Sequence, residues 1–185
     1  RWRKKNLSGS GKTTAFSKST ATTLALAAII LASLGVRLIM VRDLATPAWV
    51  DAVHHAIITR LILDQGAIPQ TYEPLQESSS ATYHLGYHVS LAVFTWLSEL
   101  PLHTSMLLFG QMLNALAALS AYLFTSTIFK NRLAGLLAAL ITGMASPMPA
   151  YYVSWGRYTQ LAGMLILPAC TALLAYLRQE QQGAG

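Results

Sequence analysis

The chain has 185 residues, of which 54% are hydrophobic and only 11% are charged, and its net charge is +6. Soluble domains usually contain about 25% charged residues, so this composition excludes an ordinary cytosolic enzyme. The positive charge does not point to nucleic acid, because six of the thirteen lysines and arginines lie in the first 18 residues, directly before an apolar segment. We therefore predict an all-α integral membrane protein, a polytopic helical bundle.

The chain begins with a basic tail, residues 1–20, that is rich in Ser, Thr and Gly. Such a segment before a membrane span is typical of the cytoplasmic side, where anionic lipid headgroups attract it. Within the tail, Asn6–Thr13 reads NLSGSGKT and differs by one residue from a phosphate-binding loop. That loop must follow a buried strand, which the preceding RWRKK cannot form, so we interpret the segment as part of the tail.

About four membrane spans and two further helices are predicted after the tail. A helix needs about 20 apolar residues to cross a bilayer, and the first such segment is 21–41. The organisation that we predict is a cytoplasmic tail at 1–20, a first span at 21–41, an outer loop with two juxtamembrane helices at 42–104, a three-span bundle at 105–178 with an outer loop at 146–158, and a second tail or truncation point at 179–185.

The topology depends on the apolar segment 85–97. Its thirteen residues would cover about 20 Å as a helix, whereas the hydrocarbon core is about 30 Å thick. If the segment crosses the membrane, the chain has seven cations inside and six outside, and if it lies along the outer surface the split is nine to four. The positive-inside rule favours the second arrangement. We therefore expect a cytoplasmic N-terminus, in the plasma membrane of a bacterium or archaeon.

The sequence PAWVDAVHHAIITRLILDQGAIP predicts the first juxtamembrane helix. Pro47 favours its start and Gly66 its end, which puts Asp51 in the first turn, where the helix dipole favours a carboxylate. His54 and His55 follow three and four residues later on the same side, so the three side chains could hold a divalent metal or form a proton relay. The alternative is that Asp51 only helps to start the helix and the histidines lie at a wet interface.

The second juxtamembrane helix is expected to open with YHLGYH. His84 and His88 are four residues apart, so they should share one helix face, where they could bind a ligand or act as acid and base. Tyr83 and Tyr87 lie beside them, and aromatic side chains favour headgroup depth. Anchoring of this helix at the membrane surface is therefore the alternative.

The loop before the last span, MPAYYVSWGRYTQ, has Arg157 as its single charge. A guanidinium can bind two phosphate oxygens through its planar fork, so Arg157 is a candidate phosphate ligand. Its aromatic neighbours could contact a sugar ring or a lipid chain; they are Tyr151, Tyr152, Trp155 and Tyr158. An interfacial aromatic belt with an incidental arginine is the alternative.

The predicted spans contain few polar side chains. Gln111 and Asn114 are three residues apart in one span, where such side chains more often bond a neighbouring helix than a substrate. Arg37 lies near the outer end of the first span, and this scarcity of charge argues against a transporter. One cysteine, Cys170, rules out a disulfide framework and a cysteine-based metal site.

Taken in chain order, these elements resemble the N-terminal module of the GT-C membrane glycosyltransferases, in particular the superfamily of protein O-mannosyltransferases and aminoarabinose transferases. In that superfamily a first span leads to an acidic residue at the start of a juxtamembrane helix, matched here by Asp51 in VDAVHHAIITRLILDQGAIP. A second juxtamembrane helix follows, matched by YHLGYHVSLAVFTWL. Two further spans then lead to an outer Tyr/Arg-rich segment, matched by MPAYYVSWGRYTQ. The resemblance covers about residues 20–178.

The resemblance implies transfer of a sugar from a polyprenyl-phosphate donor to an acceptor on the outer face of the membrane. It implies Asp51 as the catalytic base and Arg157, His84 and His88 as ligands of the donor phosphate, with a divalent metal near Asp51 as an optional cofactor. The expected partners are the lipid-linked donor and membrane lipids, without nucleic acid, and protein partners are left open. Two other functions also stay open: a non-catalytic membrane assembly subunit and a transporter fragment.

Overall fold

The fold is seen in a computed structural model that describes residues 13–75 and 83–183. Over these two ranges the chain forms seven α-helices and one π-helical turn, without a strand. This confirms the predicted all-α class. Residues 1–12 of the predicted basic tail, and with them nearly all of Asn6–Thr13, lie outside the described residues.

Four helical segments are long and apolar enough to cross a membrane, as predicted. In chain order they are α1 (Thr13–Val41), α4 (Leu102–Ile128), a broken segment made of α5 (Arg132–Leu140), the π-helical turn η1 (Ile141–Ala145) and α6 (Ala150–Ser154), and finally α7 (Tyr158–Gly183). α1 and α7 extend beyond the predicted spans because hydropathy marks only the apolar part of a helix. The predicted second tail, 179–185, is thus helical as far as Gly183.

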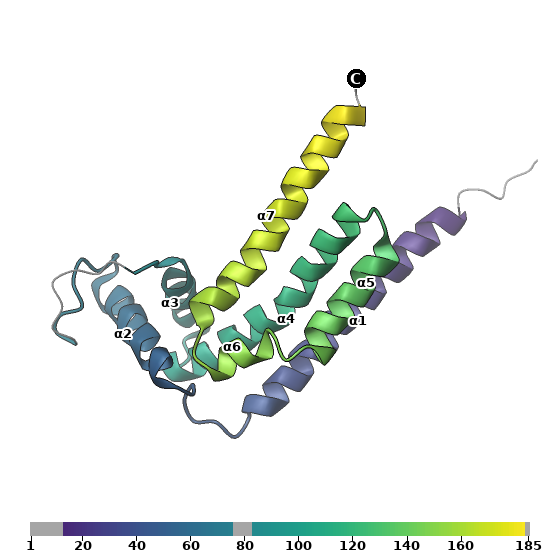
Figure 1. Cartoon of the computed structure of the whole chain (residues 1–185). Helices are drawn as coiled ribbons and strands as arrows, with labels where there is room; N and C mark the ends of the chain where they lie inside the picture. The colour runs from purple at the N-terminus through teal and green to yellow at the C-terminus, as the bar shows by residue number, and fades with distance from the viewer. Residues whose placement is uncertain (1–12, 76–82, 184–185) are drawn as a thin grey trace, which may run out of the picture.

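α4 is the central helix of the bundle. It contacts α1, α5 and α7, and Figure 1 shows α1, α4 and α5 running side by side while the C-terminal end of α7 leans away. Small residues allow the close approach of these helices: Ala118 of α4 is fully buried, and a Cβ on Gly135 of α5 would lie 2.8 Å from the Cβ of Ser126. Packing of small residues is how helices associate in lipid, where the hydrophobic effect provides little attraction between them.

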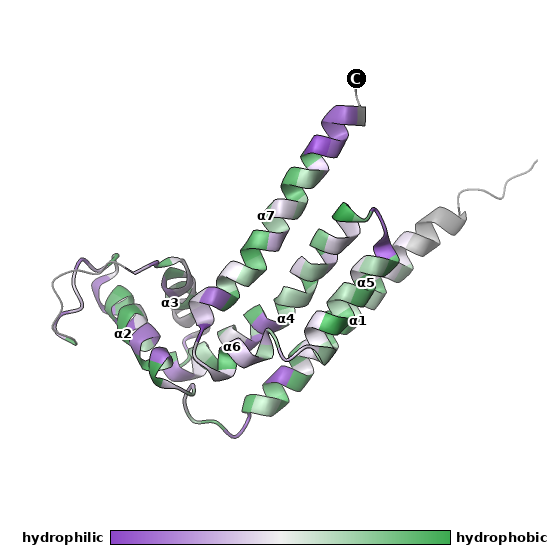
Figure 2. Ribbon diagram, viewed as in Figure 1, coloured by the Kyte–Doolittle hydropathy of each residue, from purple (hydrophilic) through white to green (hydrophobic). Residues whose placement is uncertain are grey.

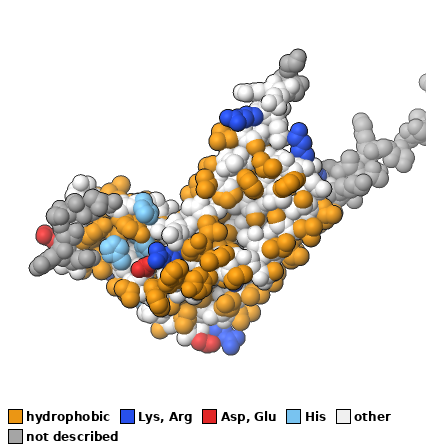
Figure 3. Space-filling model, viewed as in Figure 1, with side chains coloured by type: hydrophobic (Ala, Val, Ile, Leu, Met, Phe, Trp, Pro, Cys, Tyr) orange, Lys and Arg blue, Asp and Glu red, His pale blue; other side chains and the backbone are white. Residues whose placement is uncertain are grey.

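The outer surface of the bundle is apolar. Figure 2 shows hydrophobic residues along most of its helices, and Figure 3 shows hydrophobic side chains spread over the visible face. Leu31 of α1 is 66% exposed and Leu167 of α7 is 71% exposed. A soluble monomer rarely exposes so large an apolar area, whereas a bilayer covers it with acyl chains. The chain is therefore a multi-pass membrane protein.

Two helices outside the bundle, α2 (Val50–Gln65) and α3 (Gly86–Ser98), pack against each other. They lie beside one end of the bundle (Figure 1). With 13 residues, α3 is too short to cross a bilayer, as its sequence predicts. The expectation that His84 and His88 share a helix face is wrong, because α3 begins at Gly86 and His84 precedes it.

The third span is interrupted before it ends. The side chain of Asn131 caps its start by accepting hydrogen bonds from the backbone N–H of Leu133 and Ala134, at 2.9 and 3.2 Å. After η1, Pro147 and Pro149 have no backbone N–H to donate, so the helix cannot continue. The chain resumes as α6, and the predicted outer loop 146–158 therefore contains a short helix.

The two ends of the bundle are built from different segments. Figure 1 places the N-terminal part of α1, the turn between α4 and α5, and the C-terminal end of α7 at one end. We call the opposite end, formed by the C-terminus of α1, the N-terminus of α4 and α6, the site end; α2 and α3 lie beside it. Lys130, Arg132 and Arg178 belong to the first end, which is the arrangement that the nine-to-four distribution of cations requires.

Candidate functional site

Asp51 and Arg157, which are far apart in the sequence, meet at the site end. Asp51 lies in the first turn of α2, and Arg157 lies between α6 and α7. The Asp51 Oδ2 is 3.3 Å from the Arg157 Nε. Their side chains are 41% and 38% exposed, so each keeps accessible surface for a ligand. Figure 3 shows an acidic and a basic side chain touching here, near histidine side chains.

A glycine turn brings Arg157 to this position. The backbone N–H of Arg157 donates to the Tyr152 carbonyl at 2.8 Å, and Gly156 adopts a φ of 69°, which favours glycine. A Cβ at Gly156 would lie 3.0 Å from the backbone nitrogen of Ala52 and 3.2 Å from the Cβ of Asp51. Glycine therefore permits both the turn and its close contact with the N-terminus of α2.

The guanidinium of Arg157 also lies on an aromatic face. Its Cζ is 4.7 Å from the centroid of the Trp155 ring, within the range of a cation–π interaction. Trp155 in turn packs beside the exposed Tyr151, with ring centroids 5.2 Å apart. Tyr152 instead packs partly buried against the core. The predicted aromatic neighbours thus differ in exposure, and Tyr151 and Trp155 are the ones beside the ion pair.

A buried pair of histidines lies behind the ion pair. His55 of α2 and His88 of α3 are 3% and 0% exposed, and the His55 Nδ1 is 2.9 Å from the His88 Nε2. Burial lowers the pKa of His55 to about 4 and that of His88 to about 3, and repulsion from neighbouring histidines adds to both shifts. Both rings are therefore neutral at pH 7, so one ring nitrogen donates a hydrogen bond to the other.

His54 and His84 contact an aromatic side chain that covers the histidine pair. The ring of Tyr83 lies 5.7 Å from that of His54, 5.9 Å from that of His55 and 5.6 Å from that of His88. His84 stacks on the Tyr83 ring, with centroids 4.2 Å apart and planes inclined by 22°. The two predicted histidine pairs are therefore brought into one cluster, although His84 lies before the helix that carries His88.

Tyr158 joins this cluster to the membrane bundle. Its ring is fully buried and stacks on Tyr87 of α3, with centroids 5.3 Å apart and planes inclined by 10°. A Cβ at Gly110 of α4 would lie 2.6 Å from the Tyr158 ring, so the glycine provides the room that the ring needs. The sequence predicted Tyr158 as a substrate contact, and the structure places it in the core between α3 and α4.

A groove of about 410 Å³ runs between α3, α4 and α7. His84, Tyr87 and Ser90 line it near α3, whereas Leu113 of α4 and Leu165 and Ile166 of α7 line its apolar part. The groove therefore connects polar groups beside the histidine cluster to side chains of the membrane spans. Such a lining suits an amphiphile with a polar head and an apolar chain.

The three residues of the predicted metal site face different partners. Asp51 pairs with Arg157, His54 contacts Tyr83, and His55 contacts His88. Within residues 13–75 and 83–183, no three His, Cys, Asp or Glu side chains lie close enough to hold a metal ion together. A divalent metal near Asp51 stays a prediction, as does a proton relay through these side chains.

No pattern in the sequence connects Arg37 with polar residues of other helices. Arg37, Gln111, Asn114 and Tyr158 line one cavity at the site end. Gln111 and Asn114 of α4 were identified in the sequence by their i, i+3 spacing. Arg37 was identified as a charge inside a span. Neither signal identifies the partner helix, because the approach of α1 to α4 depends on the packing of the whole bundle.

The fold and the site define a class of protein: a multi-pass helical membrane protein with an ion pair, a histidine–aromatic cluster and an amphipathic groove at one end of its bundle. Within that class the chain belongs to DUF6541, a family of unknown function, which matches it over residues 1–185. A comparison with curated proteins found no match.

Proposed function

We propose that this protein is a glycosyltransferase, or the N-terminal module of one, that uses a polyprenyl-phosphate sugar donor. The observation that carries the proposal is the contact between Asp51 and Arg157 at 3.3 Å. It supports the proposal because a carboxylate that can act as a base and a guanidinium that can bind phosphate lie together at one end of a membrane bundle. The sequence resemblance to the GT-C glycosyltransferases assigns the same two roles to these residues.

The chemical role of Asp51 is that of a general base. An acceptor hydroxyl attacks the anomeric carbon of the sugar, and a new carbon–oxygen bond forms while the bond from that carbon to the phosphate oxygen breaks. The hydroxyl proton passes to the Asp51 carboxylate, and polyprenyl phosphate leaves with the bonding electrons. A base must lie within hydrogen-bond reach of that hydroxyl, and the 41% exposure of the Asp51 side chain leaves it accessible.

Arg157 stabilises the negative charge that develops on the departing phosphate. Asp51 faces the Nε of the guanidinium, which leaves the two terminal nitrogens for phosphate oxygens. Such preorganised charge is most effective where charge develops in the transition state. Trp155, against which Arg157 lies, and the exposed Tyr151 provide faces on which a sugar ring can pack.

The groove between α3, α4 and α7 is the place that we assign to the polyprenyl chain. Its polar part contains His84, which the sequence suggested as a phosphate ligand. Its apolar part, with Leu165 and Ile166, lies within the bundle that faces lipid. His88 is fully buried and bonded to His55, so we assign it the role of positioning α2 against α3 rather than direct contact with phosphate.

The proposed reaction takes place on the outer side of the membrane. With the N-terminal tail in the cytoplasm, Lys130, Arg132 and Arg178 are on the same side as the tail, and the site end faces outward. This orientation follows the positive-inside rule. In this orientation the acceptor reaches the site at the depth of the lipid headgroups, where the donor phosphate also lies.

Replacement of Asp51 by Asn tests the proposal. Membranes containing the protein are incubated with polyprenyl-phosphate mannose or polyprenyl-phosphate aminoarabinose that is radiolabelled in the sugar, and release of the label from lipid is measured. We expect Asp51→Asn to reduce release by at least about 100-fold, since general-base catalysis contributes about 10²–10⁴ in rate. Arg157→Lys should weaken use of the donor, because an ammonium cannot replace the guanidinium fork.

Asp64→Asn is the matched control. Asp64 lies at the other end of α2 and pairs with Arg60 at 2.8 Å in an exposed ion pair, so its loss should leave release unchanged. Wild-type release by Asp51→Asn would remove Asp51 from the mechanism. Absence of release from the wild-type protein with either donor would favour a non-catalytic role in membrane assembly.

A further inference from the structure

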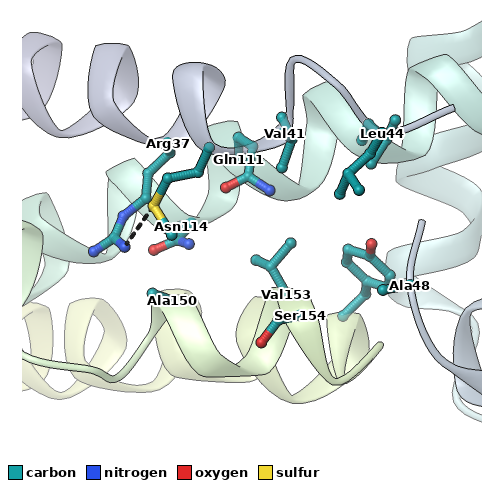
Figure 4. Close-up of a pocket in the computed structure, with 12 residues that line it drawn as sticks. Arg37, Val41, Leu44, Ala48, Gln111, Asn114, Ala150, Val153 and Ser154 are labelled. Carbon is teal, nitrogen blue, oxygen red and sulfur yellow. Dashed lines mark hydrogen bonds between the residues drawn. The ribbon is translucent and has the colours of Figure 1, made fainter. Parts of the chain in front are cut away.

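A separate cavity of about 120 Å³ lies at the site end between α1, α4 and α6. Figure 4 shows α1 and α4 on one side of it and α6 on the other. Its polar lining comes from Arg37, Gln111, Asn114 and Tyr158, and neither Asp51 nor Arg157 lines it. A cavity needs roughly 10–15 Å³ to hold one water molecule, so this one has room for several waters or for a small polar group.

Arg37 is a buried cation without a counter-charge in the described part of the chain. It is 6% exposed, and its Nη2 donates a hydrogen bond to the Gly143 carbonyl at 3.0 Å. Its Nη1 lies 3.9 Å from the Met40 sulfur, which is a weak acceptor, and its Nε has no partner. Over residues 13–75 and 83–183 no carboxylate pairs with it. A charge inside a membrane span is costly and normally finds a partner.

Two further buried polar atoms around the cavity lack hydrogen bonds within the described residues. They are the Asn114 Oδ1 and the Tyr158 hydroxyl, on side chains that are 1% and 0% exposed. Buried polar atoms are bonded in the large majority of cases, so a group of such atoms beside one cavity indicates an absent partner. That partner must accept a hydrogen bond from Arg37 and donate one to Asn114. Tyr158 lies further along α4, because its ring packs at Gly110 whereas Gly143, the acceptor of Arg37, packs at Ala118.

We propose that this cavity binds a phosphate group, with the Arg37 guanidinium as its charged ligand. A singly protonated phosphate monoester has a negatively charged oxygen for Arg37 and one P–OH for Asn114. A guanidinium binds such oxygens with strong, charge-assisted hydrogen bonds. The phosphate comes either from the headgroup of an anionic lipid or from a soluble phosphate compound.

The rim of the cavity is apolar and exposed. Met40 and Leu44 line it and are 63% and 46% exposed, at the end of a helix whose other exposed side chains are suited to lipid. A lipid headgroup can enter from the membrane at this depth while its acyl chains stay beside α1. The binding does not depend on the proposed glycosyltransferase activity, because its residues are distinct from the ion pair and it can be measured without a sugar donor.

The experiment compares the wild-type protein and Arg37→Gln in nanodiscs of phosphatidylcholine, with the thermal unfolding temperature as readout. In one arm phosphatidic acid, a lipid phosphate monoester, is added in increasing mole fraction, and in the other arm inorganic phosphate is added to the buffer. We expect one of them to raise the wild-type unfolding temperature in a saturable way. Arg37→Gln should shift the half-saturating concentration upward by at least about tenfold, as expected for loss of a charged hydrogen bond.

Arg42→Gln is the control for surface charge, because Arg42 is the first residue after α1, forms an exposed pair with Asp43 and should respond as the wild type does. Asn114→Ala, which keeps Arg37, should raise the half-saturating concentration by a smaller factor than Arg37→Gln does. It replaces Arg37→Gln as the test variant if that protein does not fold. Stabilisation by phosphatidic acid alone identifies a lipid headgroup, and stabilisation by inorganic phosphate identifies a soluble ligand. Lack of saturation in both arms, or equal responses of wild type and the cavity variants, would overturn the proposal.

Discussion

At the residue scale, His55 and His88 link the stability of the protein to pH. Both rings are neutral in the folded protein at pH 7, because burial lowers the pKa of His55 to about 4 and that of His88 to about 3. A histidine in an unfolded chain has a pKa of about 6.5. Between about pH 6.5 and pH 3 the unfolded state therefore binds more protons than the folded state, and the free energy of unfolding falls as the pH falls.

We predict that the unfolding temperature in nanodiscs decreases between pH 7 and pH 5, and that His88→Gln reduces this decrease. Each histidine contributes a slope of at most about 1.4 kcal/mol per pH unit. His103→Gln, which removes an exposed histidine of α4 outside the pair, is the control substitution. Parallel pH profiles for the wild type and His88→Gln would show that the pair is not the source of the pH dependence.

Individual site residues were predictable from the sequence, but most of their partners were not. Asp51 and Arg157 were identified separately, one by its place in the first turn of a helix and the other by its lone charge among aromatic residues. Their contact depends on Gly156 packing against Ala52, which no local pattern encodes. The contact of His55 with His88 was missed for a similar reason, since spacing along the chain indicates neighbours within one helix and not between two.

At the scale of elements, the turn between α6 and α7 determines where Arg157 lies. Gly156 has a φ of 69°, and a Cβ there would be 3.0 Å from the backbone nitrogen of Ala52. Gly66, which ends α2, has a similar φ of 62° but open space around its Cα. Substitutions at the two glycines can therefore be compared to separate two energetic costs. Both positions have the left-handed backbone conformation, and only Gly156 would also suffer steric crowding.

We predict that Gly156→Ala destabilises the protein more than Gly66→Ala does. A left-handed conformation costs about 1–2 kcal/mol for a residue with a Cβ, and both variants bear this cost. Gly156→Ala also pushes the turn away from the start of α2, which separates Arg157 from Asp51. Thermal unfolding measures the first effect and the sugar-release assay the second. Equal losses of stability and equal activities in the two variants would show that the contact with Ala52 has no role.

The helices were predictable because apolar length and turn residues are local signals. The short length of α3 and the end of α2 at Gly66 follow directly from such signals. The helix within the predicted loop 146–158 was missed, since five residues of α6 between prolines and a glycine have no periodic pattern to detect. The predicted start of the second juxtamembrane helix, at Tyr83, lies three residues before Gly86, where α3 begins. Helix boundaries are the least certain part of a prediction from sequence.

At the scale of the whole molecule, the turn that carries Lys130 and the part of α7 that carries Arg178 lie at the end of the bundle opposite to the site. The turn at Lys130–Asn131 and the end of α7 lie with the N-terminal part of α1, and the connection from α1 to α2 lies at the site end. This arrangement was predictable from the cation count together with the length of α3. The packing of α4 between α1, α5 and α7 was not, because hydropathy identifies spans without their neighbours.

We predict that, after replacement of Cys170 by Ala, a cysteine at Thr46 reacts with a membrane-impermeant thiol reagent in intact cells and a cysteine at Asn131 does not. Thr46 and Asn131 are both exposed, so the difference reports only the side of the membrane. Asn131 should react after the cells are broken, which controls for local access. Labelling of Asn131 in intact cells would reverse the orientation and place the ion pair in the cytoplasm.

The hydrogen bonds that join α1 to the third span restrict amino-acid substitution more in α1 than in the third span. Ser33 and Arg37 both donate hydrogen bonds to the carbonyl of Gly143, each at 3.0 Å. The acceptor is a main-chain atom, so almost any small residue at position 143 would still supply it, whereas each donor is a side chain that one substitution at its own position in α1 removes. Substitutions at positions 33 and 37 of the first span must therefore keep a hydrogen-bond donor, whereas a substitution at position 143 of the third span needs only a small side chain.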